Sequence, residues 1–350
     1  MNVKRFLKTI AVIVSVLTSH YGRGFEGLDD ADEQFAQPKP NSKFEFPRDY
    51  GAHPDYRIEW WYLTANLNDV DGHEYGLQWT LFRTALRPFD STGWASPQIW
   101  FAHAAITTSD YHLSTERYAR GGIGQAGVEY APFNAWIDEW SMKGADLDSL
   151  TVNAGGPTFH YQMDLKAQGP LIFHGENGFS LKSPTGQASY YYSQPFYQIE
   201  GIIDLQDGPV EVSGEAWMDR EWSSQLLSND QTGWDWFSLS FDSGAKLMGF
   251  QLRNNSGEGF SAATWIEADG RSESFGPGQF FAEPELISQV TDREIPTQWH
   301  VKLPAKSVDI KVKALNPNAW MDVSIPYWEG PIQITGTHPG RGYLEMTGYE

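Results

Sequence analysis

From Phe44 onward the chain consists of aromatic and β-branched runs separated by Gly, Asn, Asp and Pro. Apolar and polar residues alternate with a period of two in many of these runs, and no stretch of about 12 residues or more has a convincing helical period. Side chains alternate between the two faces of a strand. The pattern therefore predicts an all-β protein built from antiparallel strands.

Two hairpins are the clearest elements in the second half of the chain. One spans residues 237–253 and turns at a Ser-Gly pair, and the other spans residues 263–275 and turns at an Asp-Gly pair. Glycine supplies the positive φ that tight hairpin turns require. Consecutive hairpins of this kind predict a meander.

A short internal similarity indicates that the chain holds two related β units. Residues 58–64, IEWWYLT, align with residues 234–240, WDWFSLS, and a strand ending in Arg follows each segment. Alternation places a carboxylate, Glu59 or Asp235, at one end of each apolar strand face. Because a buried carboxylate needs a partner, we expect Arg83 and Arg253 to pair with these groups. A structural ion pair at a barrel end is the favoured interpretation.

The segment GEAWMDREW, residues 214–222, gathers acidic and aromatic side chains on one strand. Its alternation puts Glu215, Trp217, Asp219 and Glu221 on one face. Carboxylates that crowd together without screening raise the pKa of at least one of them, which keeps an acid protonated and able to donate. An exposed acidic edge strand is the alternative, and spacing alone leaves both open.

Four ordered motifs, at residues 53–67, 216–225, 233–241 and 340–349, resemble the AttH-like and carotenoid 1,2-hydratase (CrtC-like) family. The resemblance runs from about residue 44 to the C-terminus. It implies two tandem lipocalin-like antiparallel β-barrel domains, residues 44–225 and 226–350, with an apolar small-molecule pocket. Some members hydrate the terminal double bond of acyclic carotenoids, and many bacterial members carry the label predicted secreted hydrolase.

The chain departs from the hydratase members at their central motif. Those members have Tyr-His-Asp-His-Asn-Trp where this chain has WMDREW, so only Asp219 and Trp222 match. They also use a His and a Trp on a preceding strand, and the nearest counterpart here, residues 189–193 (SYYYS), contains neither. The resemblance thus implies a role for Asp219 and its Trp neighbour, and the transfer of carotenoid hydration itself is weakened.

Acid-catalysed hydration or isomerisation of a C=C bond is the chemistry we expect if the protein is an enzyme. Asp219 would be the proton donor, and aromatic side chains would stabilise the cation through their π faces. No redox or metal cofactor is needed. The competing hypothesis is a noncatalytic periplasmic carrier or scaffold, and the third is a secreted hydrolase, which lacks support because no G-x-S-x-G motif occurs. The candidate ligand-binding residues are Trp217, Trp222, Trp234, Trp236, Tyr190, Tyr192, His53 and Glu59.

Composition narrows the remaining function classes. The 350 residues carry a net charge of -20, which argues against nucleic-acid binding, and they contain no cysteine, which excludes disulfides and thiolate metal sites. The histidines are scattered singly, so we predict no metal site. An apolar small molecule is the expected partner, and protein partners are unknown.

The N-terminus predicts export to the periplasm or the medium. Lys4, Arg5 and Lys8 precede the short apolar run TIAVIVSVL, which is typical of a signal peptide and too short for a spanning helix. We assign residues 1–20 to the signal peptide and the polar residues 21–43 to a linker. The mature chain is expected to have no stable membrane insertion.

Overall fold

The structure is a computed structural model that describes residues 35–225, 230–257 and 259–349. The predicted signal peptide and the first part of the predicted linker lie outside the described residues. Residues 35–43 form no helix or strand, yet they pack on the first domain: Phe35 is buried, and the Ala36 backbone N–H donates to the Asp55 carbonyl at 2.9 Å.

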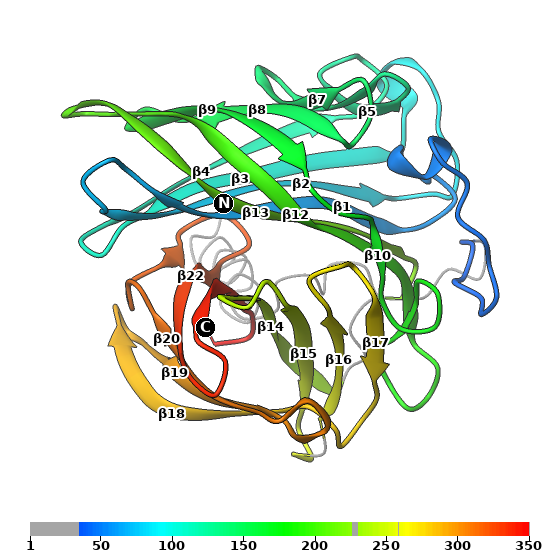
Figure 1. Cartoon of the computed structure of the whole chain (residues 1–350). Helices are drawn as coiled ribbons and strands as arrows, with labels where there is room; N and C mark the ends of the chain where they lie inside the picture. Colours follow the sequence, from blue (N-terminus) through cyan, green and yellow to red (C-terminus); the bar gives the residue numbers. More distant parts are fainter. Residues whose placement is uncertain (1–34, 226–229, 258, 350) are drawn as a thin grey trace, which may run out of the picture.

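The described residues form two antiparallel sheets, one above the other in Figure 1. The first sheet ends at Ser223 and the second begins at Gln231. This arrangement confirms the predicted all-β fold with two tandem barrel domains. None of the helices among these residues is long and apolar enough to cross a bilayer.

The first sheet has 13 strands. They are β1 (Ile58–Asn68), β2 (Glu74–Ala85), β3 (Gln98–Thr107), β4 (His112–Arg120), β5 (Ala126–Tyr130), β6 (Phe133–Ile137), β7 (Trp140–Gly144), β8 (Ser149–Gly155), β9 (Phe159–Ala167), β10 (Ile172–Phe173), β11 (Phe179–Leu181), β12 (Ala188–Leu205) and β13 (Gly208–Ser223).

The second sheet has 10 strands, and three short 3-10 helices complete the elements of the described chain. The strands are β14 (Gln231–Phe241), β15 (Lys246–Asn254), β16 (Phe260–Ile266), β17 (Ser272–Phe275), β18 (Phe281–Val290), β19 (Arg293–Leu303), β20 (Val308–Ala314), β21 (Trp320–Met321), β22 (Tyr327–Gly336) and β23 (Gly340–Met346). The helices are η1 (Arg48–Tyr50), η2 (Gly93–Ala95) and η3 (Pro304–Lys306).

The two sheets share one plan. In the first, β1 to β4 form a meander and β13 pairs with β1; in the second, β14 to β17 form a meander and β23 pairs with β14. The two segments that resemble each other in sequence therefore occupy equivalent strands, which confirms the predicted pair of related units. Both predicted hairpins are present, and their turns contain Gly244 and Gly270 at φ 87° and 85°.

Side-chain alternation builds three apolar layers from the two sheets. Trp61 and Leu63 of β1 face the core of the first domain, and Phe237 of β14 faces the core of the second. The opposite faces of β1, β12 and β13 meet the second domain in a third cluster, where Tyr62 lies in the same cluster as Trp236. Because the strands of this layer are apolar on both faces, the layer joins the two domains.

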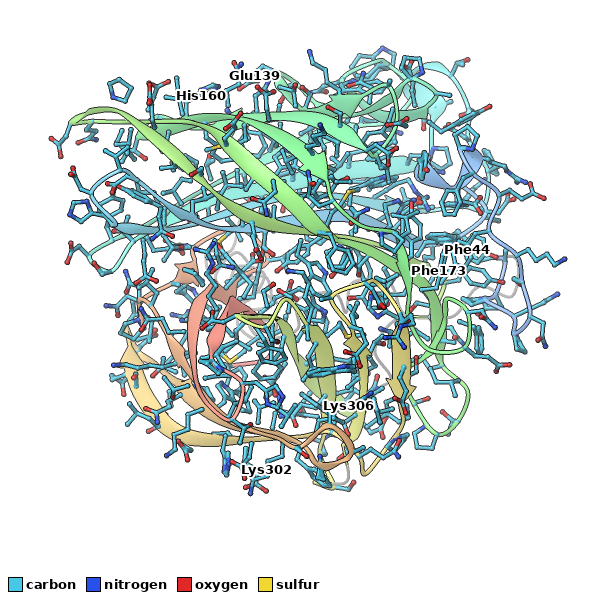
Figure 2. The ribbon with its side chains drawn as sticks, in the orientation of Figure 1. Phe44, Glu139, His160, Phe173, Lys302 and Lys306 are labelled. Carbon is cyan, nitrogen blue, oxygen red and sulfur yellow. The ribbon has the colours of Figure 1, made fainter. Side chains whose placement is uncertain are left out.

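Figure 2 shows polar side chains at the outer surface of both domains, with Glu139 and His160 on one domain and Lys302 on the other. The aromatic pair Phe44 and Phe173 lies at the flank of the first domain, with ring centroids 5.0 Å apart. Phe44 thus anchors the start of the first domain to β10.

Candidate functional site

A cavity of about 160 Å³ lies between the two domains. Its walls are mainly aromatic and aliphatic, and three carboxyl groups and one ammonium interrupt them. The lining residues are Ile58, Trp60, Tyr62, Phe82, Lys182, Gln187, Ala188, Ser189, Tyr191, Asp219, Glu221, Ser223, Gln225, Trp234, Trp236, Phe250, Leu252 and Glu345. Concave apolar surfaces with a few convergent polar groups are typical ligand sites.

The first domain supplies one wall of this cavity through strand registry. Asp219 of β13 lies opposite Tyr62 of β1. Two residues along β13, Glu221 lies between Trp60 of β1 and Tyr191 of β12. Side chains two apart on a strand share a face, so these groups all point at the second domain.

The second domain supplies the facing wall from β14, β15 and β23. Trp236 of β14 lies between Phe250 of β15 and Glu345 of β23. The Trp236 Nε1–H donates to the Tyr191 hydroxyl at 3.0 Å. A hydrogen bond thus ties the two walls together beside Asp219.

Asp219 is a buried acid held by neutral groups. Its Oδ1 accepts hydrogen bonds from the Trp217 Nε1–H at 2.7 Å and from the Ser193 hydroxyl, and its Oδ2 accepts one from Tyr191 at 2.9 Å. Burial raises the pKa of Asp219 to about 7, against the effect of these donors, and the nearby charge of Glu221 raises it further. A substantial fraction of this carboxyl is therefore protonated near neutral pH.

A second line of hydrogen bonds extends from Asp219 away from the cavity. Ser193 also contacts His174 Nε2 at 2.6 Å, and His174 Nδ1 contacts the Thr264 hydroxyl at 3.0 Å. His174 is fully buried, and burial lowers its pKa to about 3, so its imidazole is neutral. The neutral ring can accept a hydrogen bond at one nitrogen while it donates one at the other. The hydrogen bonds from Asp219 through Ser193 to His174 can therefore form whether Asp219 is protonated or ionised.

Glu221 differs from Asp219 because it has a cationic partner. Lys182 Nζ lies 2.9 Å from Glu221 Oε1. The same ammonium lies 4.2 Å from the ring centroid of Phe250 and 4.9 Å from that of Tyr191. The aromatic wall thus already accommodates one positive charge by cation–π contact.

Glu345 brings a third carboxyl to the cavity from the second domain. Its Oε1 accepts a hydrogen bond from the Trp234 Nε1–H at 2.5 Å. Burial raises the pKa of Glu345 to about 7, and the charges of Asp219 and Glu221 add to the effect. The sequence places Glu345 on the closing strand of the second domain, and it gives no sign that this residue faces Asp219.

The structure divides the predicted site residues into two groups. Trp217, Trp234 and Trp236 lie with Asp219 at the interface of the domains. The other five lie on the opposite face of the first sheet, at the end of its barrel; they are Trp222, Tyr190, Tyr192, His53 and Glu59. The two groups are separated because Trp222 and Asp219 are three residues apart on β13, so their side chains point to opposite faces of the sheet.

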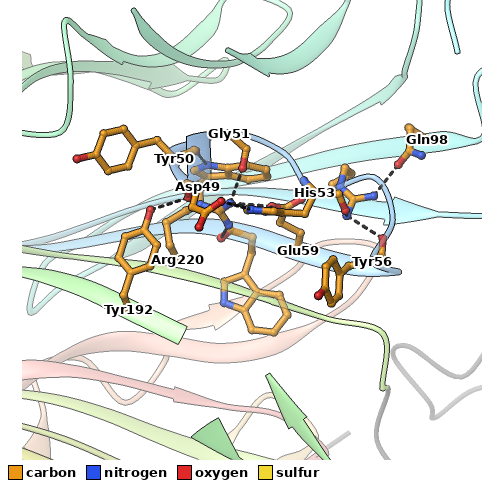
Figure 3. A network of polar contacts seen from close by, with 12 residues as sticks. Asp49, Tyr50, Gly51, His53, Tyr56, Glu59, Gln98, Tyr192 and Arg220 are labelled. Atoms are coloured by element: carbon orange, nitrogen blue, oxygen red, sulfur yellow. Dashed lines mark hydrogen bonds and ion pairs between the residues drawn. The ribbon is translucent and has the colours of Figure 1, made fainter. Parts of the chain in front are cut away.

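The barrel-end group surrounds an ion-pair network, shown in Figure 3. Glu59 is fully buried and receives Arg83 Nε at 2.8 Å and Arg220 Nη2 at 2.7 Å. The predicted pairing with Arg83 is confirmed, and Arg220 is a second partner. His53 Nδ1 lies 2.7 Å from the carboxylate, and its ring stacks on Trp222 at 4.0 Å.

The direction of the pKa shift in this network is opposite to that of Asp219. Burial alone would raise the pKa of Glu59, but the adjacent Arg220 and Arg83 guanidinium groups hold that pKa well below its usual range. The Arg83 donors are also satisfied by Gln98 and by backbone carbonyls. The ion pairs of this network stabilise one conformation of the barrel end, and they hold Glu59 in its charged form.

The two candidate tyrosines also serve the barrel end. The Tyr192 hydroxyl donates to the Asp49 carbonyl at 3.0 Å, and the Tyr190 hydroxyl accepts from the Lys39 N–H at 2.9 Å. Tyr191, between them, faces the cavity instead. The sequence indicated an aromatic strand here, but only its registry with β13 reveals that Tyr191 and Ser193 are the neighbours of Asp219.

Together, these features define a two-domain lipocalin-like β-barrel protein with a buried acid in an apolar cavity between its domains. The chain belongs to the AttH-like family, whose model matches residues 37–349. A crystal structure of an AttH candidate from Nitrosomonas europaea is 33% identical, with a TM-score of 0.83 over 90% of this chain and 99% of that one. The predicted family resemblance is thus confirmed.

Two more distant structures share the fold. Kievitone hydratase from Nectria haematococca is 12% identical, with a TM-score of 0.67 over 91% of this chain and 98% of that one. CghA in complex with Sch210972 is also 12% identical, with a TM-score of 0.56 over 91% of this chain and 95% of that one. No curated protein matches the chain.

Proposed function

We propose that this protein is exported and binds an apolar, isoprenoid-like or polyene-like molecule between its domains, where Asp219 protonates a C=C bond. The observation that carries the proposal is the environment of Asp219: a buried carboxyl that contacts only neutral donors and lines an aromatic cavity. A carboxyl with a pKa of about 7 is matched to proton donation near neutral pH.

Protonation begins a short sequence of bond changes. The Asp219 O–H bond breaks as a C–H bond forms at the less substituted alkene carbon, and the other carbon becomes a tertiary cation. Capture of this cation by water gives an alcohol, and loss of a neighbouring proton gives an isomerised alkene. In both outcomes one proton is released, from the captured water or from the neighbouring carbon, and its return to the Asp219 carboxylate restores the acid for the next turnover.

The cavity wall supports the cationic intermediate. Trp60, Trp234 and Trp236 line the cavity together with Phe250, and each π face stabilises a nearby cation by about 0.5–2 kcal/mol. The Lys182 ammonium lies 4.2 Å from the Phe250 ring centroid, which supports the proposal that this wall accommodates positive charge.

A fold-level analogy points the same way. Kievitone hydratase, a hydratase by name, shares the two-domain fold. A shared fold at 12% identity does not establish the same reaction, because function resides in the site and not in the fold.

A serine hydrolase is disfavoured by the order of the contacts around Ser193. In a catalytic triad the carboxylate orients the histidine, and the histidine contacts the serine. Here Asp219 contacts Ser193 directly, while the other nitrogen of His174 contacts Thr264. Ser193 is also absent from the cavity lining, so its hydroxyl does not meet a ligand there.

The test begins with the ligand. Native mass spectrometry of the mature protein, purified without detergent and followed by organic extraction, identifies any retained molecule. That molecule is then incubated in D₂O with the wild type, Asp219→Asn and the control Asp164→Asn, which alters an exposed carboxylate on β9.

We expect deuterated product from the wild type and the control, and a loss of at least about 100-fold in Asp219→Asn with ligand affinity retained. Retained ligand without any conversion would establish the carrier hypothesis instead. Full activity of Asp219→Asn would show that another group is the acid.

A further inference from the structure

Glu345 faces Asp219 across the cavity, and the two carboxyls come from different domains. Both line the same space. Strand pairing and two hydrogen bonds relate them: Trp236 is the register partner of Glu345 in the β14–β23 pair, and its indole N–H donates to Tyr191, which in turn donates to Asp219. The relative position of the two acids therefore depends on the packing of the domains.

We propose that Glu345 is the second catalytic carboxyl of this cavity, the base that accepts a proton from the attacking water while Asp219 serves as the acid. The inference rests on the function proposed above and adds a residue to it. It also assigns the site jointly to both domains, because neither domain alone contains both groups.

The charges around Glu345 favour a pair that shares one proton. Like charges that face each other in a buried site do not both ionise readily. Near neutral pH one carboxyl therefore holds a proton while the other is ionised, which supplies an acid and a base at the same time. The titratable groups that face Glu345 are Asp219 and Glu221 of β13, Glu329 and Tyr327 of β22, Tyr62 of β1, Tyr191 of β12 and, through its pair with Glu221, Lys182.

Glu329 is a titratable neighbour of Glu345 on the same sheet, and it has a different role. It lies directly opposite Glu345, but it is buried, absent from the cavity lining and hydrogen-bonded to the Tyr62 hydroxyl. Burial raises the pKa of Glu329 well above its usual range, and the nearby charge of Glu345 raises it further, so the charged form of Glu329 is disfavoured.

The proton balance of a hydration closes with these two groups. Asp219 loses a proton to the alkene carbon, the water oxygen forms a bond to the cation, and the departing water proton passes to the Glu345 carboxylate. The net reaction adds one water to the alkene. Solvent at the half-exposed residues Gln187 and Gln225 then returns the proton from Glu345 to Asp219.

The test measures the coupling of the two acids without any substrate. The full chain is labelled with ¹³C at the side-chain carboxyls, and Asp219 is titrated by NMR in the wild type, Glu345→Gln and Glu345→Asp. Glutamine keeps an oxygen that can accept from Trp234, so the variant is expected to fold, and thermal unfolding checks this. Exposed Asp164→Asn is the matched control for a lost remote charge.

We expect Glu345→Gln to lower the pKa of Asp219 by about one unit, because a like charge is removed. Glu345→Asp should restore most of the effect, and Asp164→Asn should have none. An Asp219 pKa that is unchanged in Glu345→Gln would overturn the proposal. The outcome is independent of turnover, so a failure of the proposed alkene chemistry remains distinguishable from a failure of the pair.

Discussion

Glu59 and Asp219 are two buried carboxyls on neighbouring strands of one sheet, yet their surroundings give them opposite properties. Glu59 points into the end of the first barrel, where two guanidinium groups hold its pKa well below the usual range. Asp219 points at the second domain, where indole and hydroxyl donors leave its pKa at about 7.

The comparison shows that burial alone does not set the pKa of a carboxyl group. The charged or neutral groups that contact the carboxyl decide the direction of the shift. Both groups lose solvent, but cations compensate for the charge of Glu59 and neutral donors compensate only partly for that of Asp219. One strand pair therefore carries a carboxyl with a lowered pKa on one face and a carboxyl with a raised pKa on the other. Alternation of side chains along β1 and β13 keeps the two environments apart.

The largest expected effect on stability comes from breaking the ion-pair network around Glu59. Glu59→Gln leaves the buried Arg83 and Arg220 charges uncompensated and should lower the free energy of unfolding by about 3–5 kcal/mol. Urea denaturation at pH 7 measures this. The control is Glu139→Gln, which removes an exposed partner of Arg117 and should cost less than about 1 kcal/mol. Equal losses of unfolding free energy in the two variants would contradict a structural role for Glu59.

Asp219→Asn should show the opposite sign, and its effect should depend on pH. Because the folded pKa lies above the unfolded value of 3.8, the stability associated with the protonated group is complete below pH 3.8 and is lost as pH rises toward 7. That loss amounts to roughly 4 kcal/mol for a shift of about three units.

Asparagine stays neutral and avoids this loss. We therefore expect the stability of Asp219→Asn, relative to the wild type, to be roughly 2–3 kcal/mol greater at pH 8 than at pH 5. Urea denaturation at the two pH values tests this. A relative stability that is the same at both pH values would mean that Asp219 is ionised throughout the range.

Tyr191→Phe sharpens the comparison by removing one neutral donor. Loss of this hydrogen bond from Oδ2 should raise the pKa of Asp219 by about 0.5–1 unit, because the bond favours the ionised form. Tyr192→Phe is the matched control, since its hydroxyl lies on the opposite face and donates to Asp49. NMR titration of Asp219 should show no change in the control, and equal shifts in both variants would refute this geometry.

The local pattern of the sequence was sufficient for the strands and their faces. Alternation correctly predicted an apolar strand face that ends in Glu59, where the structure places Trp61 and Leu63, and a shared face for Trp217 and Asp219, because these relations involve residues close in the chain. The family resemblance supplied the two-domain arrangement, which local periodicity does not encode.

The composition of the cavity could not be predicted in the same way. Tyr191 faces Asp219 because of the registry between β12 and β13, and a shift of one residue would place Tyr190 or Tyr192 there instead. Glu345 reaches the cavity only through packing of the second sheet against the first. Registry and domain packing are long-range properties, and a single sequence gives no direct signal of either.

The most direct test of this account is the pKa of Asp219 in the full-length protein. Side-chain ¹³C NMR, with the Asp219 resonance assigned by its loss in Asp219→Asn, follows the carboxyl from pH 3 to pH 9. The account predicts a midpoint of about 7, and thus a protonated acid in the cavity at slightly acidic to neutral pH. A midpoint at or below the ordinary value of 3.8 would contradict the assignment of Asp219 as the proton donor.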